Sequence, residues 1–153
     1  YADLLKKIVE TNSLIAKRKN QNIVLLVETD CKITADSGKL TEIIDNLLNN
    51  AIKYSQKGQQ IDVRLWEEGE KVILEVKDRG QGFTHSDKKQ LFGRFSKLSA
   101  QPTDGENSTG LGLFIVKELV NAHKGSIYAE SEGEGKGAVF RVELPKKQNL
   151  QKN

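Results

Sequence analysis

The sequence predicts an α/β fold, a two-layer sandwich in which a mixed β-sheet packs on helices that cover one of its faces. Two periodicities predict it. Apolar residues recur every three or four positions in some segments, as in helices that bury one stripe, and every second position in others, as in strands with one buried face. With 153 residues, 37% of them hydrophobic, the chain suffices for one domain with an ordinary core.

Apolar periodicity places the elements of the first half in order. They are a helix at 1–20, strands at 23–27 and 32–34, a helix at 42–54, and a hairpin of strands at 61–65 and 72–76. The first helix ends in a basic cluster, the segments 23–27 and 32–34 look like short strands, and the second helix stops at Lys57-Gly58. In the hairpin every second residue is apolar, which predicts one buried face.

The second half is less regular. Its elements are a short helical piece at 87–92, a helix at 113–123, and strands at 126–131 and 138–144. The segment 78–109 is mostly irregular. The helix 113–123 is amphipathic and is closed by Gly125, the two strands join through a glycine-rich turn, and Pro145 ends the fold.

Composition narrows the possible functions. The net charge is only +3, and no basic stripe is interleaved with aromatic residues, so we expect no nucleic-acid partner. The single cysteine, Cys31, excludes an internal disulfide and predicts a half-buried strand thiol. The longest apolar run, 23–27, is too short to span a bilayer, and we expect no direct membrane contact. The chain opens at Tyr1 without a signal peptide, which suggests a piece of a longer parent.

The helix 42–54 carries a second chemistry opposite its apolar stripe. At about 100° per residue, Asn46, Asn50 and Lys53 fall within about 60° of one another. Amide oxygens are neutral ligands for a hard cation, and a lysine is a point charge for phosphate. These residue types are therefore suited to a metal–phosphate cluster, although a solvated helix face can carry them without any function.

Two glycine-bearing segments follow. Asp78 ends a predicted strand, where its carboxylate could accept from an exocyclic amine, and Gly80 and Gly82 would let the backbone pass close under a flat ring. A simple turn is the alternative interpretation. The run 108–113 precedes a helix, whose free N–H groups and dipole favour a polyphosphate, although an ordinary glycine entry into a helix fits as well.

No known phosphate fingerprint explains these glycines, because the chain contains neither a Walker A pattern nor G-x-G-x-x-G. Between the two glycine segments, residues 98–109 have almost no apolar anchor and include Pro102 and Gly105. A long polar loop inside a compact domain is usually functional or disordered. We expect it to act as a lid that closes over bound phosphate.

In this order the motifs resemble the catalytic ATP-binding domain of two-component sensor histidine kinases, a GHKL domain of the superfamily shared with gyrase-type ATPases. The motifs are N-L-L-x-N-A-x-K-Y at 46–54, D-x-G-x-G at 78–82, F-x-R-F at 92–95, T-G-L-G-L at 109–113 and G-x-G-A-V-F at 135–140. The resemblance covers roughly 22–145 and implies the Bergerat-type ATP-binding fold.

The resemblance implies ATP and Mg²⁺ as ligands. It implies an ATP site made of Asn46, Asn50, Lys53, Tyr54, Asp78, Gly80, Gly82, Lys97, Thr109, Gly110, Leu111 and Gly112. Asn50 would ligate Mg²⁺ with support from Asn46, Lys53 would contact phosphates, and Asp78 would accept from the adenine amino group. Lys97 would reach the γ-phosphate, so the catalytic set is Asn46, Asn50, Lys53 and Lys97.

One position separates the branches of the superfamily. Hydrolytic members resembling gyrase carry a glutamate where Asn46 stands, and use it to activate water. Since an amide is a poor general base, Asn46 favours transfer to an external acceptor over hydrolysis.

The resemblance also implies the domain organisation. Residues 1–21 would be a helical linker from a missing upstream dimerisation and phosphoacceptor hairpin. Residues 22–145 would be the catalytic ATP-binding domain, with a lid at about 97–109, and 146–153 a disordered basic tail. The partners would be that upstream histidine domain and a response regulator receiver domain. The expected location is cytoplasmic, whether or not the parent is membrane-anchored.

The expected function is therefore that of a protein-histidine kinase module, which transfers the γ-phosphate of ATP to a histidine on a separate domain. His85 and His123 lack the helical context of a phosphoacceptor, so we expect them to be structural. A non-catalytic nucleotide-binding sensor or docking module, and a serine/threonine kinase of the same superfamily, remain the alternatives.

Overall fold

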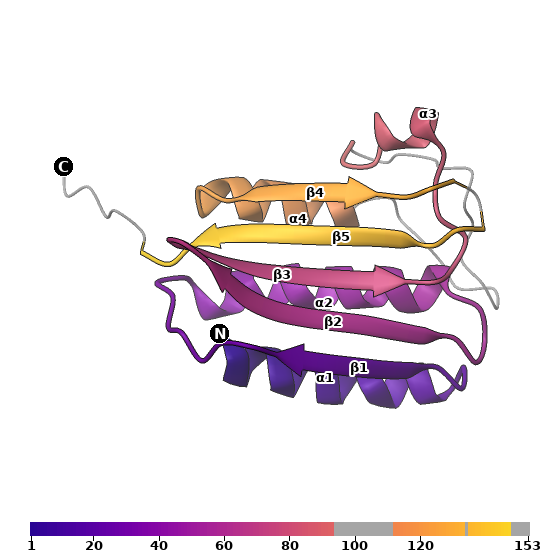
Figure 1. Cartoon of the computed structure of the whole chain (residues 1–153), viewed down its shortest axis with the longest axis horizontal. Helices are drawn as coiled ribbons and strands as arrows, with labels where there is room; N and C mark the ends of the chain where they lie inside the picture. Colours follow the sequence, from indigo (N-terminus) through magenta and orange to yellow (C-terminus); the bar gives the residue numbers. More distant parts are fainter. Residues whose placement is uncertain (94–111, 134, 148–153) are drawn as a thin grey trace.

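The computed structural model describes residues 1–93, 112–133 and 135–147, in which a five-stranded sheet carries α1, α2 and α4 on one face (Figure 1). The elements are α1 (Ala2–Lys17), β1 (Asn22–Val27), α2 (Ser37–Tyr54), β2 (Gln60–Glu68), β3 (Lys71–Asp78), α3 (His85–Lys88), α4 (Gly112–Ala122), β4 (Ser126–Glu130) and β5 (Ala138–Pro145). This arrangement confirms the predicted two-layer α/β sandwich.

The sheet is mixed. Its strand order is β1-β2-β3-β5-β4, with β1 parallel to β2 and the remaining neighbours antiparallel. The parallel pair requires a crossover, which α2 provides. Because β3 and β5 are neighbours, the last residue of β3, Asp78, lies opposite the first residue of β5, Ala138. The register of the sheet thus brings together two segments that are far apart in the chain.

One hydrophobic core joins the helices to the sheet. α1 contributes Leu5, Ile8 and Val9 to the same cluster of buried residues as α2 and the strands. The stripe that the sequence predicts on α2 is fully buried: Leu40, Ile43, Ile44, Leu47, Leu48, Ala51 and Ile52. α1 therefore packs as part of this core, and its continuation from an upstream hairpin stays a prediction.

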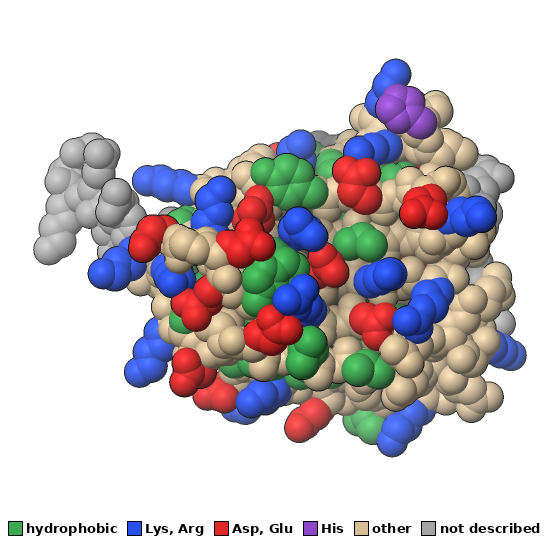
Figure 2. All heavy atoms as spheres, in the orientation of Figure 1, with side chains coloured by type: hydrophobic (Ala, Val, Ile, Leu, Met, Phe, Trp, Pro, Cys, Tyr) green, Lys and Arg blue, Asp and Glu red, His purple; other side chains and the backbone are tan. Residues whose placement is uncertain are grey.

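No helix of the described residues covers the other face of the sheet, which carries intermixed basic and acidic side chains with smaller apolar areas (Figure 2). Near its middle Trp66 is only 9% exposed, because two guanidinium groups lie over its ring. The Cζ atom of Arg64 is 4.3 Å and that of Arg141 5.5 Å from the ring centroid. The aliphatic parts of such side chains shield an aromatic ring from water while their charges stay solvated.

The structure corrects several predicted elements. The expected strand at 32–34 is absent from the described residues, because one backbone hydrogen bond, from Thr34 N to Lys146 O just after β5, stands in place of a ladder with a neighbouring strand. Cys31 is accordingly half-buried on an irregular segment. α2 begins earlier than predicted, at Ser37, because the Asp36 side chain caps it by accepting from Lys39 N at 2.9 Å.

The short helix predicted at 87–92 instead spans His85–Lys88. A capping box fixes its start: Thr84 Oγ1 accepts from Asp87 N, and the Asp87 carboxylate accepts from Thr84 N. Within the ranges that the structure covers, no helix combines the length and apolar character needed to cross a membrane.

Candidate functional site

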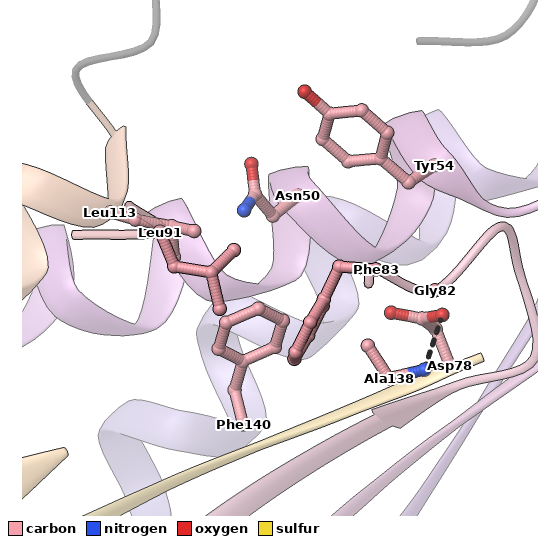
Figure 3. A pocket seen from close by; sticks show the side chains of 9 residues that line it. All are labelled: Asn50, Tyr54, Asp78, Gly82, Phe83, Leu91, Leu113, Ala138 and Phe140. Atoms are coloured by element: carbon pink, nitrogen blue, oxygen red, sulfur yellow. Dashed lines mark hydrogen bonds between the residues drawn. The ribbon is translucent and has the colours of Figure 1, made fainter. Parts of the chain in front are cut away.

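A hollow opens between α2 and the ends of β3 and β5 (Figure 3). Its lining consists of Asn50, Tyr54, Asp78, Gly82, Phe83, Leu91, Leu113, Ala138 and Phe140. Counting its opening to solvent, the hollow encloses about 370 Å³ of space. Two separate motifs therefore meet at one place: the motif 46–54 contributes Asn50 and Tyr54, and the motif 78–82 contributes Asp78 and Gly82.

Asp78 lies at the floor of the hollow and is 5% exposed. Its Oδ1 atom accepts from Gly80 N at 3.0 Å and from Ala138 N at 3.2 Å. These are the only hydrogen bonds that the Asp78 carboxylate makes to the described residues, so Oδ2 keeps its capacity to accept from a ligand. Burial raises the pKa of Asp78 to about 6, while the two N–H donors act in the opposite direction. A desolvated carboxylate with one unused oxygen is a strong and selective acceptor for an amine.

The loop that follows Asp78 is held against a second loop, residues 131–137. Gly137 N donates to Gly80 O at 3.1 Å, and Gly135 N donates to Gln81 O at 2.6 Å. A Cβ on Gly80 would collide with the carbonyl oxygen of Tyr54 at the end of α2. Gly80 thus packs against the protein's own backbone, whereas Gly82, with φ of +66°, borders the hollow.

Ser131 organises these two loops, and the sequence gives no sign of it. Its Oγ atom accepts from Phe83 N and from Gly133 N, each at 3.2 Å, and donates to Gly137 O at 2.7 Å. Phe83 is 48 positions away in the chain. A serine before a glycine-rich turn is a common pattern, so only the folded structure identifies Ser131 as a residue that supports the site.

The wall of the hollow opposite the carboxylate is apolar. The rings of Phe83 and Phe140 lie 6.2 Å apart between centroids at 53° to one another, and Leu91 and Leu113 complete this wall. Leu113 and Phe140 fall within quoted motifs, but none of the four was predicted as a site residue, because buried aromatic and aliphatic side chains ordinarily belong to a core. An apolar wall facing a single carboxylate suits a flat ring that carries an amino group.

The helix α2 borders the other side. Asn50 and Tyr54 are one turn apart and both line the hollow, whereas Lys53 is half-buried on the same helix, outside the lining. One turn earlier, Asn46 Nδ2 donates to Glu42 O at 2.8 Å. A Cβ on Gly112 would lie 3.2 Å from Asn46 Oδ1, so the first residue of α4 is next to the polar face of α2.

Several predicted site residues lie outside the described residues. They are Lys97, Thr109, Gly110 and Leu111, together with the expected lid at 97–109. Of the F-x-R-F motif, Phe92 is described: it is half-buried against the core, with Lys117 Nζ 5.3 Å from its ring centroid. Its packing accords with a structural role.

The donor set limits how a metal ion could bind. Across 1–93, 112–133 and 135–147, no group of three or more His, Cys, Asp or Glu side chains could hold a metal ion. An ion here would rely on amide and ligand oxygens. Mg²⁺ suits such a site, because it keeps water and is commonly bound by few protein ligands plus substrate phosphates.

His123, at the end of α4, is buried, and its Nδ1 atom is 2.8 Å from Leu119 O.

Comparison with known proteins gives one family. The family model described as histidine kinase-, DNA gyrase B-, and HSP90-like ATPase matches residues 35–148. The sensor histidine kinase WalK of Bacillus subtilis is 37% identical over 151 residues, which are 93% of this chain and 24% of WalK. The sensor protein KdpD of Clostridium acetobutylicum is 38% identical over 129 residues, 84% of this chain and 14% of KdpD. The chain thus spans a quarter or less of these relatives.

Solved structures agree with the sequence comparison. A mycobacterial sensor histidine kinase, MprB, superposes with a TM-score of 0.84 and 25% identity over 95% of both chains. Full-length ShkA in complex with AMPPNP gives a TM-score of 0.79 and 31% identity over 94% of this chain and 29% of ShkA. The resemblance inferred from the motifs is thereby confirmed. The chain belongs to the family of histidine kinase-, DNA gyrase B- and HSP90-like ATPases, with sensor histidine kinases as its relatives.

Proposed function

We propose that the hollow binds ATP with its adenine ring against Phe83 and Phe140 and its amino group on Asp78. The observation that carries this proposal is the hydrogen bonding of Asp78, whose Oδ1 is occupied by two backbone amides while Oδ2 remains for a ligand. Guanine presents a carbonyl where adenine presents an amine. GTP would therefore bring an acceptor against a buried carboxylate and bind poorly. The AMPPNP bound to ShkA supports an ATP-type ligand.

The triphosphate would extend along the polar face of α2 toward Gly112. Asn50 would offer its amide oxygen to Mg²⁺, Asn46 would support it, and Lys53 would contact phosphate. Bound Mg²⁺ would supply charge neutralisation for the phosphates. The start of α4 at Gly112 adds the positive end of a helix dipole, which is favourable to an anion. The expected contacts from Lys97, Thr109, Gly110 and Leu111 remain predictions.

We further propose that the chain transfers the γ-phosphate to a histidine on a separate dimerisation domain of the parent, from which it passes to a receiver domain. Phosphoryl transfer depends mainly on positioning and on charge neutralisation, which Asn50, Lys53 and the α4 start would supply. Asn46 supports transfer over hydrolysis, because its amide is a poor base and its Nδ2 already donates to Glu42 O.

Calorimetric titration with a non-hydrolysable ATP analogue, with and without Mg²⁺, tests the nucleotide site. We expect saturable binding at one site, tighter with Mg²⁺, and much weaker binding of the GTP analogue. A folded sample that binds neither analogue would refute the proposal. Binding of ATP without transfer to a supplied histidine domain would leave the non-catalytic sensor module as the function.

A further inference from the structure

The last turn of α2 carries Lys53 and Tyr54, and its carbonyl groups need partners from elsewhere. The final four carbonyls of a helix have no partner within it. Here Ala51 O accepts from Ser55 N at 3.2 Å, and Tyr54 O accepts from Gln81 N at 3.2 Å. Ile52 O accepts from two side chains that do not belong to the site: Lys19 Nζ at 2.7 Å and Gln21 Nε2 at 3.1 Å.

Lys19 and Gln21 come from the turn between α1 and β1. Asn20, between them, has a φ of +53°, so the backbone reverses here and directs both side chains inward. Lys19 is 6% and Gln21 4% exposed. The Nε2 atom of Gln21 also donates to Ser55 O at 3.0 Å, and Gly58 N donates to Lys19 O at 3.0 Å. The turn is therefore joined to the end of α2 by side chains and backbone alike.

Burying the Lys19 ammonium group and the Gln21 amide costs free energy of folding unless other contacts compensate for it. A buried ammonium group loses its hydration, and Oε1 of Gln21 is buried without any hydrogen-bond partner. The compensation for the ammonium is local, since the carboxyl end of an 18-residue helix carries roughly half a negative charge. Apolar side chains would fill the same space at lower cost but could not hold the carbonyl groups of α2.

We infer that Lys19 is a positioning residue for the nucleotide site. By fixing Ile52 O, it sets the placement of the next two residues: Tyr54, which lines the hollow, and Lys53, which lies beside it on the same helix. The inference rests on the proposed function, because it assigns Lys19 a role in placing groups that contact ATP. It also makes the site sensitive to the placement of the turn after α1, which contacts the same last turn of α2 as the Asp78 loop does.

The test compares Lys19→Met with Asn12→Ala. Methionine keeps the length of the side chain and removes the donor. Asn12 is a matched control because it is a buried polar residue that also bonds to α2, from its Nδ2 atom to Asp45 Oδ1 at 2.9 Å, but far from the last turn. Each protein is labelled with 3-fluorotyrosine and examined by ¹⁹F NMR without nucleotide, then titrated with ATP and Mg²⁺. Substituting Tyr54 with Phe assigns its signal among the three tyrosines.

We expect Lys19→Met to move or broaden the Tyr54 signal, to leave that of Tyr128 in place, and to weaken ATP binding about tenfold. Asn12→Ala should leave the Tyr54 signal in place and change the affinity for ATP by no more than about twofold. An unmoved Tyr54 signal, or a moved signal with unchanged affinity, would overturn the inference. If the unsubstituted chain binds no ATP, the proposed function fails by itself. The Tyr54 signal still decides whether Lys19 fixes the end of α2. If Lys19→Met does not fold, Gln21→Leu is judged by the same criteria.

Discussion

The backbone amide of Ala138 donates a 3.2 Å hydrogen bond to Oδ1 of Asp78, although 60 positions separate the two residues in the chain. The contact follows from the antiparallel register of β3 and β5, in which these residues are paired. A second amide, Gly80 N, shares the same oxygen. The sheet register thus helps to set which carboxylate oxygen the hollow presents, and the proposed preference for adenine depends on that oxygen.

Replacing Asp78 with Asn should weaken ATP binding on the order of 100-fold while the fold is retained. The amide oxygen can still accept from Gly80 and Ala138, but the NH₂ group then faces the adenine amine, and two donors oppose each other. Calorimetry measures the loss. Asp62→Asn is the control, because this carboxylate lies on the neighbouring strand and pairs with Arg79 at the surface. Equal affinity of Asp78→Asn and the unsubstituted chain for ATP would refute the adenine assignment.

Asp78 should also make the stability of the nucleotide-free protein depend on pH. Burial raises its pKa from an ordinary value of 3.8 to about 6, so the folded state binds the proton more tightly than the unfolded state. The corresponding contribution to stability is complete below about pH 3.8 and is lost as the pH rises through about 6. It amounts to roughly 3 kcal/mol.

Urea unfolding of the parent chain and of Asp78→Asn between about pH 4.5 and 7.5 measures this contribution. The difference in unfolding free energy between them should grow in favour of Asp78→Asn as the pH rises, because other titrating groups cancel. A difference that stays constant across this range would contradict the burial of an ionisable carboxyl.

Gly137, which packs against Asp78, should tolerate a side chain far less well than Gly69, which lies in the turn between β2 and β3. Gly137 and Gly69 both have positive φ, +76° and +59°, and each Gly→Ala change should cost about 1 kcal/mol for that reason. A Cβ on Gly137 would in addition collide with Asp78 O and approach Arg79 Cα to 3.0 Å, whereas a Cβ on Gly69 meets nothing within 4 Å. Thermal unfolding should show Gly137→Ala about 1–3 kcal/mol less stable than Gly69→Ala.

Weaker ATP binding should accompany the Gly137→Ala change, because the Asp78 loop must shift to make room. Equal stability of the two alanine variants would argue against the close packing of residues 131–137 on that loop.

Asn50 should account for the metal dependence of binding. In Asn50→Ala the chain loses the amide oxygen proposed for Mg²⁺, so adding Mg²⁺ should no longer tighten ATP binding, while the affinity measured in EDTA stays nearly the same. Asn49→Ala is the matched control, because Asn49 precedes it on α2 and does not line the hollow. Retention of the full Mg²⁺ effect in Asn50→Ala would exclude this residue as the ligand.

Local patterns predicted most of the fold. Helical spacing gave α2 its buried stripe, and alternation gave the hairpin β2–β3, because both depend on neighbours a few residues away. The segment 32–34 looked like a strand by composition but has no partner ladder, which only the tertiary arrangement decides. Capping by Asp36 and by Thr84 is local, but it set two helix starts that apolar periodicity does not mark.

The candidate site was predictable only in part. Asp78, Asn50, Tyr54 and Gly82 carry motif patterns and do meet in the hollow. Ser131 and Lys19 could not be found this way, because their partners lie 48 and 33 positions away in the chain. Their chemistry, a hydroxyl and an ammonium group bonded to backbone, becomes informative only when the contacts are known.

The most direct test of the central claim is phosphate transfer from γ-labelled ATP to a histidine-bearing hairpin domain of the parent protein. We expect label on the hairpin in the presence of this chain and Mg²⁺, and we expect that label to be lost when the hairpin histidine is replaced or when Asp78 is changed to Asn. A folded chain that binds ATP but releases free phosphate, with no label on the hairpin, would contradict it.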